Sequence, residues 1–174
     1  LDGMASGGIR DHLGGGFARY SVDAQWLVPH FEKMLYDNGL LAEVYLQAFQ
    51  VTNHQRHADV AREILRYLCR DLIDPAGGFH CSEDADSEGI EGKFYVWAPE
   101  EIDSVLGKKR GAQFSKIYDV TPRGNFEHGK SILNLPVTLG EWANRFDIEV
   151  NNLTSERKLD RLKLLEEREK RVRP

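Results

Sequence analysis

The stretch HFEKMLYDNGLLAEVYLQAFQVTNHQRHADVAREILRYLCRDL, from His30 to Leu72, predicts two consecutive helices. Apolar residues recur three and four positions apart from about His30 to Thr52, and again from about Gln55 to Leu72. This is the spacing of a helix that buries one face. Asn53 is a suitable stop, and so short a connection makes the two helices antiparallel neighbours. The stretch therefore predicts a mainly α fold built from helical hairpins.

The segment before this hairpin is rich in glycine. Six glycines lie within residues 3–16, and an irregular stretch with several aromatic residues follows as far as Pro29. Glycine lets the chain turn tightly and lets other groups approach the backbone. Pro29 holds the preceding residue extended and suits the start of a helix. We expect a flexible glycine-rich loop beside the first helix, which would begin at about His30.

The segment after the hairpin predicts a small β-hairpin insertion. The residues at 74–78 include one proline and two glycines, which end the second helix. Within residues 77–97, Phe79 and Cys81 alternate on one expected strand, and Phe94 and Val96 lie on the return strand. The acidic residues between them would form a long tip.

The rest of the chain predicts further helices. One opens at Pro99 and closes at Gly107, another turn covers residues 111–119, and the capping-box spacing of Thr138 and Glu141 begins a third. From about residue 154 the chain is highly charged and carries only a thin leucine stripe, so we expect a long exposed helix or a connector without its partner. The predicted division is a partial helical domain at 1–148 and a charged tail at 149–174.

The composition is that of an ordinary globular protein. Of the 174 residues, 41% are hydrophobic and 29% are charged, and the net charge is −5. The acidic balance argues against a basic surface for nucleic acid or anionic lipid, and no apolar run approaches the length of a membrane span. The two cysteines do not form a disulfide framework, and no secretory leader opens the chain, so a cytoplasmic location is expected. The absence of an initiator methionine suggests a piece of a longer chain.

Three motifs carry a resemblance to a known family. They are Asp11 to Asn38 (DHLGGGFARYSVDAQWLVPHFEKMLYDN), Gly77 to Trp97 and Gly124 to Leu133. In this order they resemble long, uncharacterised proteins called spermatogenesis-associated or thioredoxin-domain-containing. The resemblance covers roughly residues 1–135. It implies part of a C-terminal six-hairpin (α/α)6 toroid, similar to N-acylglucosamine 2-epimerase and six-hairpin glycosidases. The family's thioredoxin-like domain and its CxxC motif are missing from this sequence, and the charged tail has no counterpart that we can assign.

The first motif concentrates polar and aromatic side chains of the kind that bind sugars. Aromatic faces stack on a sugar ring, carboxylates and arginine bind its hydroxyls, and histidine or a carboxylate moves protons. We interpret His30 and Asp37 as acid/base candidates, the former as a neutral base at a helix start. The expected substrate-binding residues of this motif are Asp11, His12, Arg19, Tyr20, Lys33 and Tyr36. The alternative is structural: Lys33 and Asp37, four apart, would form an intrahelical ion pair and His30 would be a capping residue.

The acidic loop of the second motif supplies the remaining candidates. Asp84 could act as a catalytic carboxylate and Asp86 could bind substrate, as in glycoside hydrolysis. The loop opens like a calcium loop, but Tyr95 stands where the bidentate glutamate belongs. Trp97 would stack on a sugar from the return strand, although aromatics there are more often core residues. The alternative for the loop is a solvated turn. No metal or cofactor is expected.

These observations leave two classes of function open. The first is a carbohydrate-active domain that hydrolyses or epimerises a saccharide in the full-length protein. The second is a non-catalytic binding or regulatory scaffold that works with a thioredoxin-like domain. Convergence of Asp11, His30, Asp37 and Asp84 on one cavity would favour the enzyme, and their separation would favour the scaffold. The chain alone is expected to be inactive and to associate with copies of itself, because a partial toroid leaves helix faces uncovered.

Overall fold

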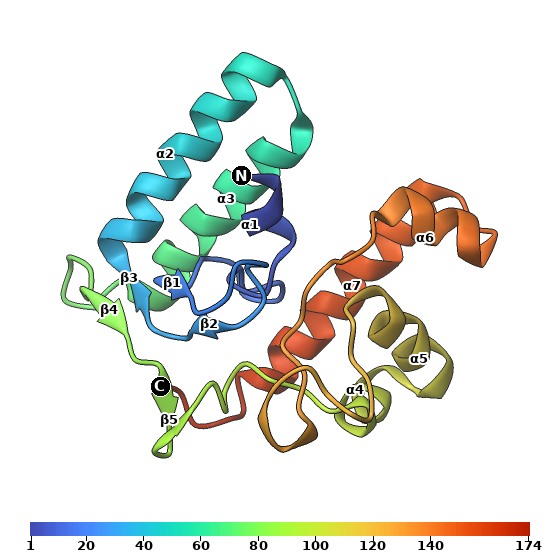
Figure 1. The fold of residues 1–174 in the computed structure, drawn as a ribbon. Helices are drawn as coiled ribbons and strands as arrows, with labels where there is room; N and C mark the ends of the chain where they lie inside the picture. The colour runs from blue at the N-terminus through green and yellow to red at the C-terminus, as the bar shows by residue number, and fades with distance from the viewer.

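The computed structural model describes residues 1–174 and is mainly α, with seven α-helices and three two-stranded sheets. The predicted helical hairpin is confirmed: α2 (Leu35–Thr52) and α3 (Gln55–Tyr67) lie antiparallel, and the short α1 (Asp2–Ser6) packs beside them (Figure 1). A π-helical turn, η1 (Leu68–Leu72), extends α3. The helix α2 ends at Asn53, as predicted, and this residue adopts the left-handed conformation.

The predicted start of the first helix at His30 is wrong. Residues 29–34 are extended: β2 (Pro29–His30) pairs with β1 (Tyr20–Ser21), and β3 (Lys33–Met34) pairs with β4 (Ser82–Glu83). The backbone of these residues pairs with strands outside the helix, and the Lys33 side chain is held by the buried carboxylate of Asp11. The expected helical pairing of Lys33 with Asp37 therefore does not form.

The predicted β-hairpin over residues 77–97 is also wrong in its pairing. Its first half joins β3, whereas β5 (Asp86–Ser87) and β6 (Ile90–Glu91) form their own small hairpin. Glu88 and Gly89 connect these two strands with φ values of 53° and 74°, which is the backbone of a tight two-residue turn. The aromatic residues after this hairpin occupy a turn and an isolated bridge, so they share no strand face.

The second half of the chain forms a second helical core. It contains α4 (Pro99–Leu106), α5 (Lys108–Ile117), the 3-10 turn η2 (Glu127–Gly129), α6 (Leu139–Phe146) and α7 (Val150–Arg168). The predicted capping box is present, since Thr138 accepts a hydrogen bond from the N–H of Glu141 at 3.2 Å. Trp97, Ile102, Phe114 and Tyr118 are buried in this core.

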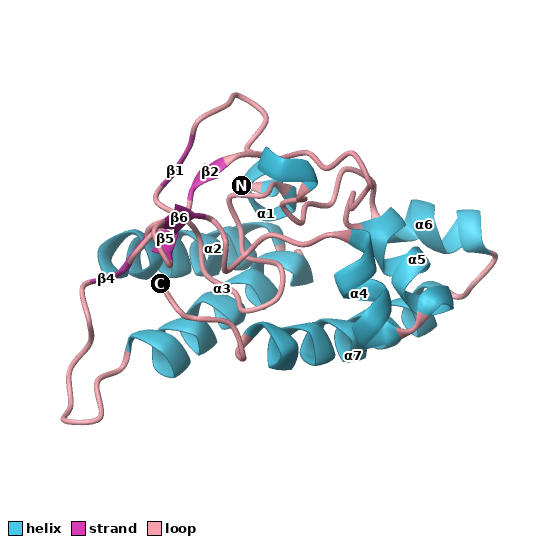
Figure 2. Ribbon diagram, turned by 90° about the horizontal axis from the view of Figure 1, so that it is seen from below, coloured by secondary structure: helices cyan, strands magenta, loops and turns pink.

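The charged tail is not an exposed helix. Leu153 and Leu164 of α7 are buried in the second core, and Arg168 is buried against the first half of the chain. The residues after α7 return to the β5–β6 region, where the Ser87 hydroxyl donates a hydrogen bond to the Val172 carbonyl at 2.6 Å. Figures 1 and 2 show α7 crossing the molecule and the C-terminus beside β5. The expected exposed helix or free connector is therefore wrong, and the domain division at residue 149 stays a prediction.

A buried amide fixes the loop before α2. Asn38 accepts a hydrogen bond from the Phe17 N–H at 2.8 Å and donates to the carbonyls of Phe17 at 3.0 Å and Met34 at 2.9 Å.

An Asn38→Ala variant should lose about 2 kcal/mol of unfolding free energy, because the Phe17 peptide would keep no partner. Urea denaturation measures this. Asn151→Ala, at an exposed site on α7, should change stability by less than about 0.5 kcal/mol. Equal stabilities of the two variants would contradict the role of Asn38.

None of the helices is both long and apolar enough to cross a bilayer.

Candidate functional site

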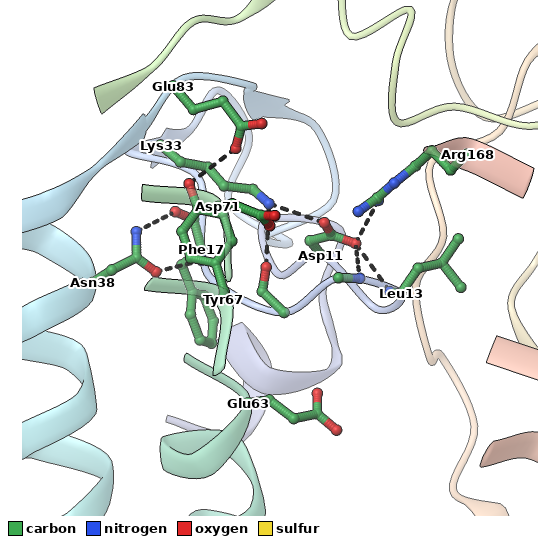
Figure 3. Close-up of polar contacts among 12 residues, drawn as sticks. Asp11, Leu13, Phe17, Lys33, Asn38, Glu63, Tyr67, Asp71, Glu83 and Arg168 are labelled. Carbon is green, nitrogen blue, oxygen red and sulfur yellow. Dashed lines mark hydrogen bonds and ion pairs between the residues drawn. The ribbon is translucent and has the colours of Figure 1, made fainter. Parts of the chain in front are cut away.

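The first motif is built around a buried carboxylate (Figure 3). Asp11 Oδ2 accepts a hydrogen bond from Lys33 Nζ at 2.9 Å, and its Oδ1 accepts from Arg168 Nη1 at 2.8 Å. The backbone N–H groups of Leu13 and Gly14 also donate to Oδ1, each at 2.9 Å. The side chains of Asp11, Lys33 and Arg168 are only 5%, 4% and 3% exposed. We call these three residues the inner network.

The inner network keeps Asp11 ionised. Burial alone would raise the pKa of its carboxyl, but the charges of Arg168 and Lys33 and the hydrogen bonds outweigh burial and hold that pKa well below its ordinary range. Lys33 Nζ also lies 4.3 Å from the ring centre of Tyr67 and 4.8 Å from that of Tyr95. The carboxylate and the ammonium are thus both fully engaged inside the protein, so neither is placed to move a substrate proton.

His12 is another structural member of the motif. Its Nε2 lies 2.9 Å from the carbonyl of Gly7, and its ring packs edge-on against Tyr118 with centroids 5.5 Å apart. Burial, reinforced by the charge of Arg10, lowers the pKa of His12 to about 3. The ring is therefore neutral at physiological pH and donates to a backbone carbonyl.

A small cavity of about 30 Å³ lies beside the inner network. Asp11, His12 and Lys33 line it together with apolar side chains that include Phe31 and Tyr95. Its volume suits a single water molecule and excludes a sugar ring. The lining includes none of the proposed proton-transfer residues, His30, Asp37 and Asp84. Of Asp11, His30, Asp37 and Asp84, only Asp11 lines this cavity, so the four residues do not converge on it.

A second group from the same motif lies at the surface. Arg19 Nη1 donates to Glu32 Oε2 at 3.1 Å, and His30 Nδ1 lies 2.7 Å from Glu91 Oε1. The ring of Tyr20 stacks on the His30 ring with centroids 5.0 Å apart, because the two residues are partners in the β1–β2 ladder. Tyr36 and Asp37 follow in the first turn of α2. We call this surface the outer cluster; its members are Arg19, Tyr20, His30, Glu32, Tyr36, Asp37 and Glu91.

Asp37 is the unusual carboxyl of the outer cluster. Burial raises its pKa, the charge of Arg19 opposes this, and the charge of Glu32 adds to the rise, so the net shift is upward. Its Oδ2 atom is buried and has no hydrogen-bond partner. The raised pKa makes Asp37 a candidate proton donor.

The candidates from the second motif lie elsewhere. Asp84 Oδ1 accepts from the backbone N–H of Ala85 at 2.6 Å and of Asp86 at 3.3 Å, which is the hydrogen bonding of a solvated turn. Asp86 is exposed and makes no side-chain hydrogen bond or ion pair. Trp97 is fully buried in the second core with Arg171 4.0 Å from its ring centre, so it is not available to stack on a sugar. No three histidine, cysteine or carboxylate side chains are grouped to hold a metal ion.

Two important partners of the candidate residues could not be predicted from the sequence. Arg168 reaches Asp11 across 157 positions of the chain, and Glu91 reaches His30 across 61. Arg168 and Glu91 lie in charged segments whose sequence is typical of an exposed surface. The local pattern there contains no information about a distant partner. Only a structure or co-variation between relatives could reveal these pairs.

The comparisons with known proteins find relatives along most of the chain, although no family model matches it. Spermatogenesis-associated protein 20 of Homo sapiens is 40% identical over 98% of this chain, and that of Mus musculus is 41% identical over 84%. An uncharacterized protein of Caenorhabditis elegans is 37% identical over 88%. The chain spans only about a quarter of the length of these relatives, with 25%, 22% and 24% covered. Identity near 40% over most of its length supports the membership of this chain in the spermatogenesis-associated protein 20 family.

Proposed function

We propose that this segment is a non-catalytic binding scaffold whose outer cluster recognises a hydroxyl-rich ligand such as a saccharide. The observation that carries the proposal is the placement of Tyr20. This residue is 49% exposed, and its ring stacks on that of His30, with the Arg19–Glu32 ion pair beside it. An aromatic face next to paired donors and acceptors suits a sugar ring and its hydroxyls.

A second candidate is catalysis in the full-length protein, supported by Asp37. Its raised pKa suits a general acid, and Glu32 supplies a second carboxylate nearby. Hydrolysis or epimerisation of a saccharide would then need further residues from the three quarters of the relatives that this chain does not cover.

The toroid remains part of the same proposal. Tyr36, Leu40 and Val44 are spaced four apart on α2 and are all exposed, so this helix presents an apolar stripe to solvent. A further helical hairpin of a six-hairpin toroid would cover such a stripe, and so would a second copy of the chain.

Saccharide titration followed by NMR tests the binding proposal. Monosaccharides and disaccharides, including N-acylated glucosamine, should shift the resonances of the outer cluster. Tyr20→Ala should weaken this binding by about tenfold, the worth of one aromatic stacking contact. Phe79→Ala is the matched control, since Phe79 is also 49% exposed but lies outside the outer cluster. Absence of any shift, or equal weakening by both variants, would overturn the proposal.

The catalytic candidate has its own test. Asp37→Asn in a full-length relative should leave saccharide binding in place and reduce any turnover by at least about a hundredfold. Turnover that survives in this variant would exclude Asp37 as the proton donor without affecting the binding proposal.

A further inference from the structure

A basic groove of about 650 Å³ is lined by residues of α3, of α7 and of the segment 135–139. Two carboxylates, Asp59 and Glu63, lie in its lining. Seven cationic residues also line it, giving a formal excess of five positive charges in a chain whose net charge is −5. The net charge of the sequence predicted no basic surface. It did not reveal this groove because the acidic residues that outweigh these cations lie elsewhere in the chain. The seven cations are Arg10, Arg56, Arg62, Arg66, Arg157, Lys158 and Arg161.

Helical spacing explains how the cations gather. Arg62 and Arg66 are four apart on α3, and Arg157 and Arg161 are four apart on α7. Residues four apart share a helix face, so each helix turns a basic edge toward the same groove. Like charges brought together in this way repel each other, and a bound anion would relieve the repulsion.

One partly buried glutamate, Glu63, orients two arginines on the floor of the groove. Glu63 accepts hydrogen bonds from both terminal nitrogens of Arg161, at 3.0 and 2.9 Å, and from Arg10 at 2.5 Å. Burial alone would raise the pKa of Glu63, but these two guanidinium groups outweigh burial and lower it to about 2. Glu63 therefore stays ionised and holds two arginines in fixed positions, which reduces the ordering cost of binding a ligand.

Several donors of the groove have no partner within the protein. Arg66 and Lys158 are exposed and make no ion pair. The Nε atoms of Arg157 and Arg161 are buried and have no hydrogen-bond acceptor. Arg66 and Lys158 are therefore the cations of this set that an anion in the groove can reach, whereas the two Nε atoms are covered by the protein.

We propose that the basic groove binds a small, multiply charged anion, namely a ligand that carries two or more phosphate groups. Its volume lies within the range of small-molecule sites. Arginine forks match the geometry of phosphate oxygens, and the two helices supply cations from opposite walls. None of the groove residues belongs to the outer cluster, so the two sites are independent.

Calorimetric titration with inorganic tripolyphosphate at about 0.1 M salt tests the groove. The 174-residue chain should bind one equivalent saturably. The double variant Arg66→Gln/Lys158→Gln should bind at least about tenfold more weakly, since it removes two of the free cations. Lys108→Gln/Lys109→Gln is the matched control: it removes two exposed cations from α5, outside the groove, and should bind within about twofold of the unaltered chain.

Three outcomes would overturn the proposal. They are no saturable binding, an equal loss in both double variants, and unchanged affinity in the groove variant. An equal loss would mean that diffuse charge attracts the anion. Because Arg66 and Lys158 make no structural ion pair, thermal unfolding of the free groove variant should match that of the unaltered chain, so weaker binding would not reflect a damaged fold.

Discussion

Replacing Asp11 with alanine is expected to lower the free energy of unfolding by about 3–5 kcal/mol, the range for breaking a buried ion pair. The substitution leaves Lys33 and Arg168 buried without a counter-charge, and it also removes the acceptor for the Leu13 and Gly14 N–H groups. The loss should be large because Asp11 joins the glycine-rich loop, β3 and the end of α7. Urea denaturation at neutral pH measures it.

Two comparisons separate this effect from a general loss of negative charge. Asp86→Ala removes an exposed carboxylate without an ion pair and should change stability by less than about 0.5 kcal/mol. Arg168→Ala should approach the loss seen in Asp11→Ala, and the double variant should lose much less than the sum, because both changes break the same interaction. Additive losses would show that the inner network does not act as a unit.

The parts of the fold that depend on local interactions could be predicted from the sequence, and those that depend on long-range contacts such as the inner network could not. The hairpin α2–α3 and the capping box at Thr138 depend on interactions between residues a few positions apart, and the sequence predicted both. The short strands around Lys33 depend on partners far along the chain, since β3 pairs with β4 across about fifty residues. The prediction from local periodicity therefore began the helix too early. Phe31 and Met34 fit the helical pattern, but the contact between Lys33 and Asp11 holds this segment outside the helix.

The candidate site divides for the same reason. Closeness in the sequence grouped Asp11, Lys33 and Asp37 as one polar motif, but the chain turns at Pro29 and again at Leu35, and successive side chains of an extended strand point to opposite sides. Lys33 therefore lies inside with Asp11, whereas His30 and Glu32 remain at the surface. Asp11, His12 and Lys33 of this motif therefore have a structural role, and the sugar-binding role of the remaining residues stays a prediction.

Glu63→Gln is expected to lower the free energy of unfolding by about 3 kcal/mol at pH 7, because Arg10 and Arg161 would lose their shared carboxylate. The size of this loss should depend on pH. The folded-state pKa of Glu63 is lowered to about 2 from an ordinary value of 4.5. Its carboxylate therefore contributes full stability above about pH 4.5, and this contribution disappears as the pH falls toward 2.

Urea denaturation from pH 7 down to pH 2 measures this dependence. The gap between the unaltered chain and Glu63→Gln should stay constant above pH 4.5 and close progressively below it, since protonated Glu63 resembles glutamine in charge. Asp11 also loses its charge in acid, but it is present in both proteins and cancels in the difference. Glu43→Gln, at an exposed position on α2, should show no comparable gap at any pH. A gap of constant size down to pH 2 would mean that Glu63 stabilises the chain by packing, and the electrostatic account of the groove floor would then fail.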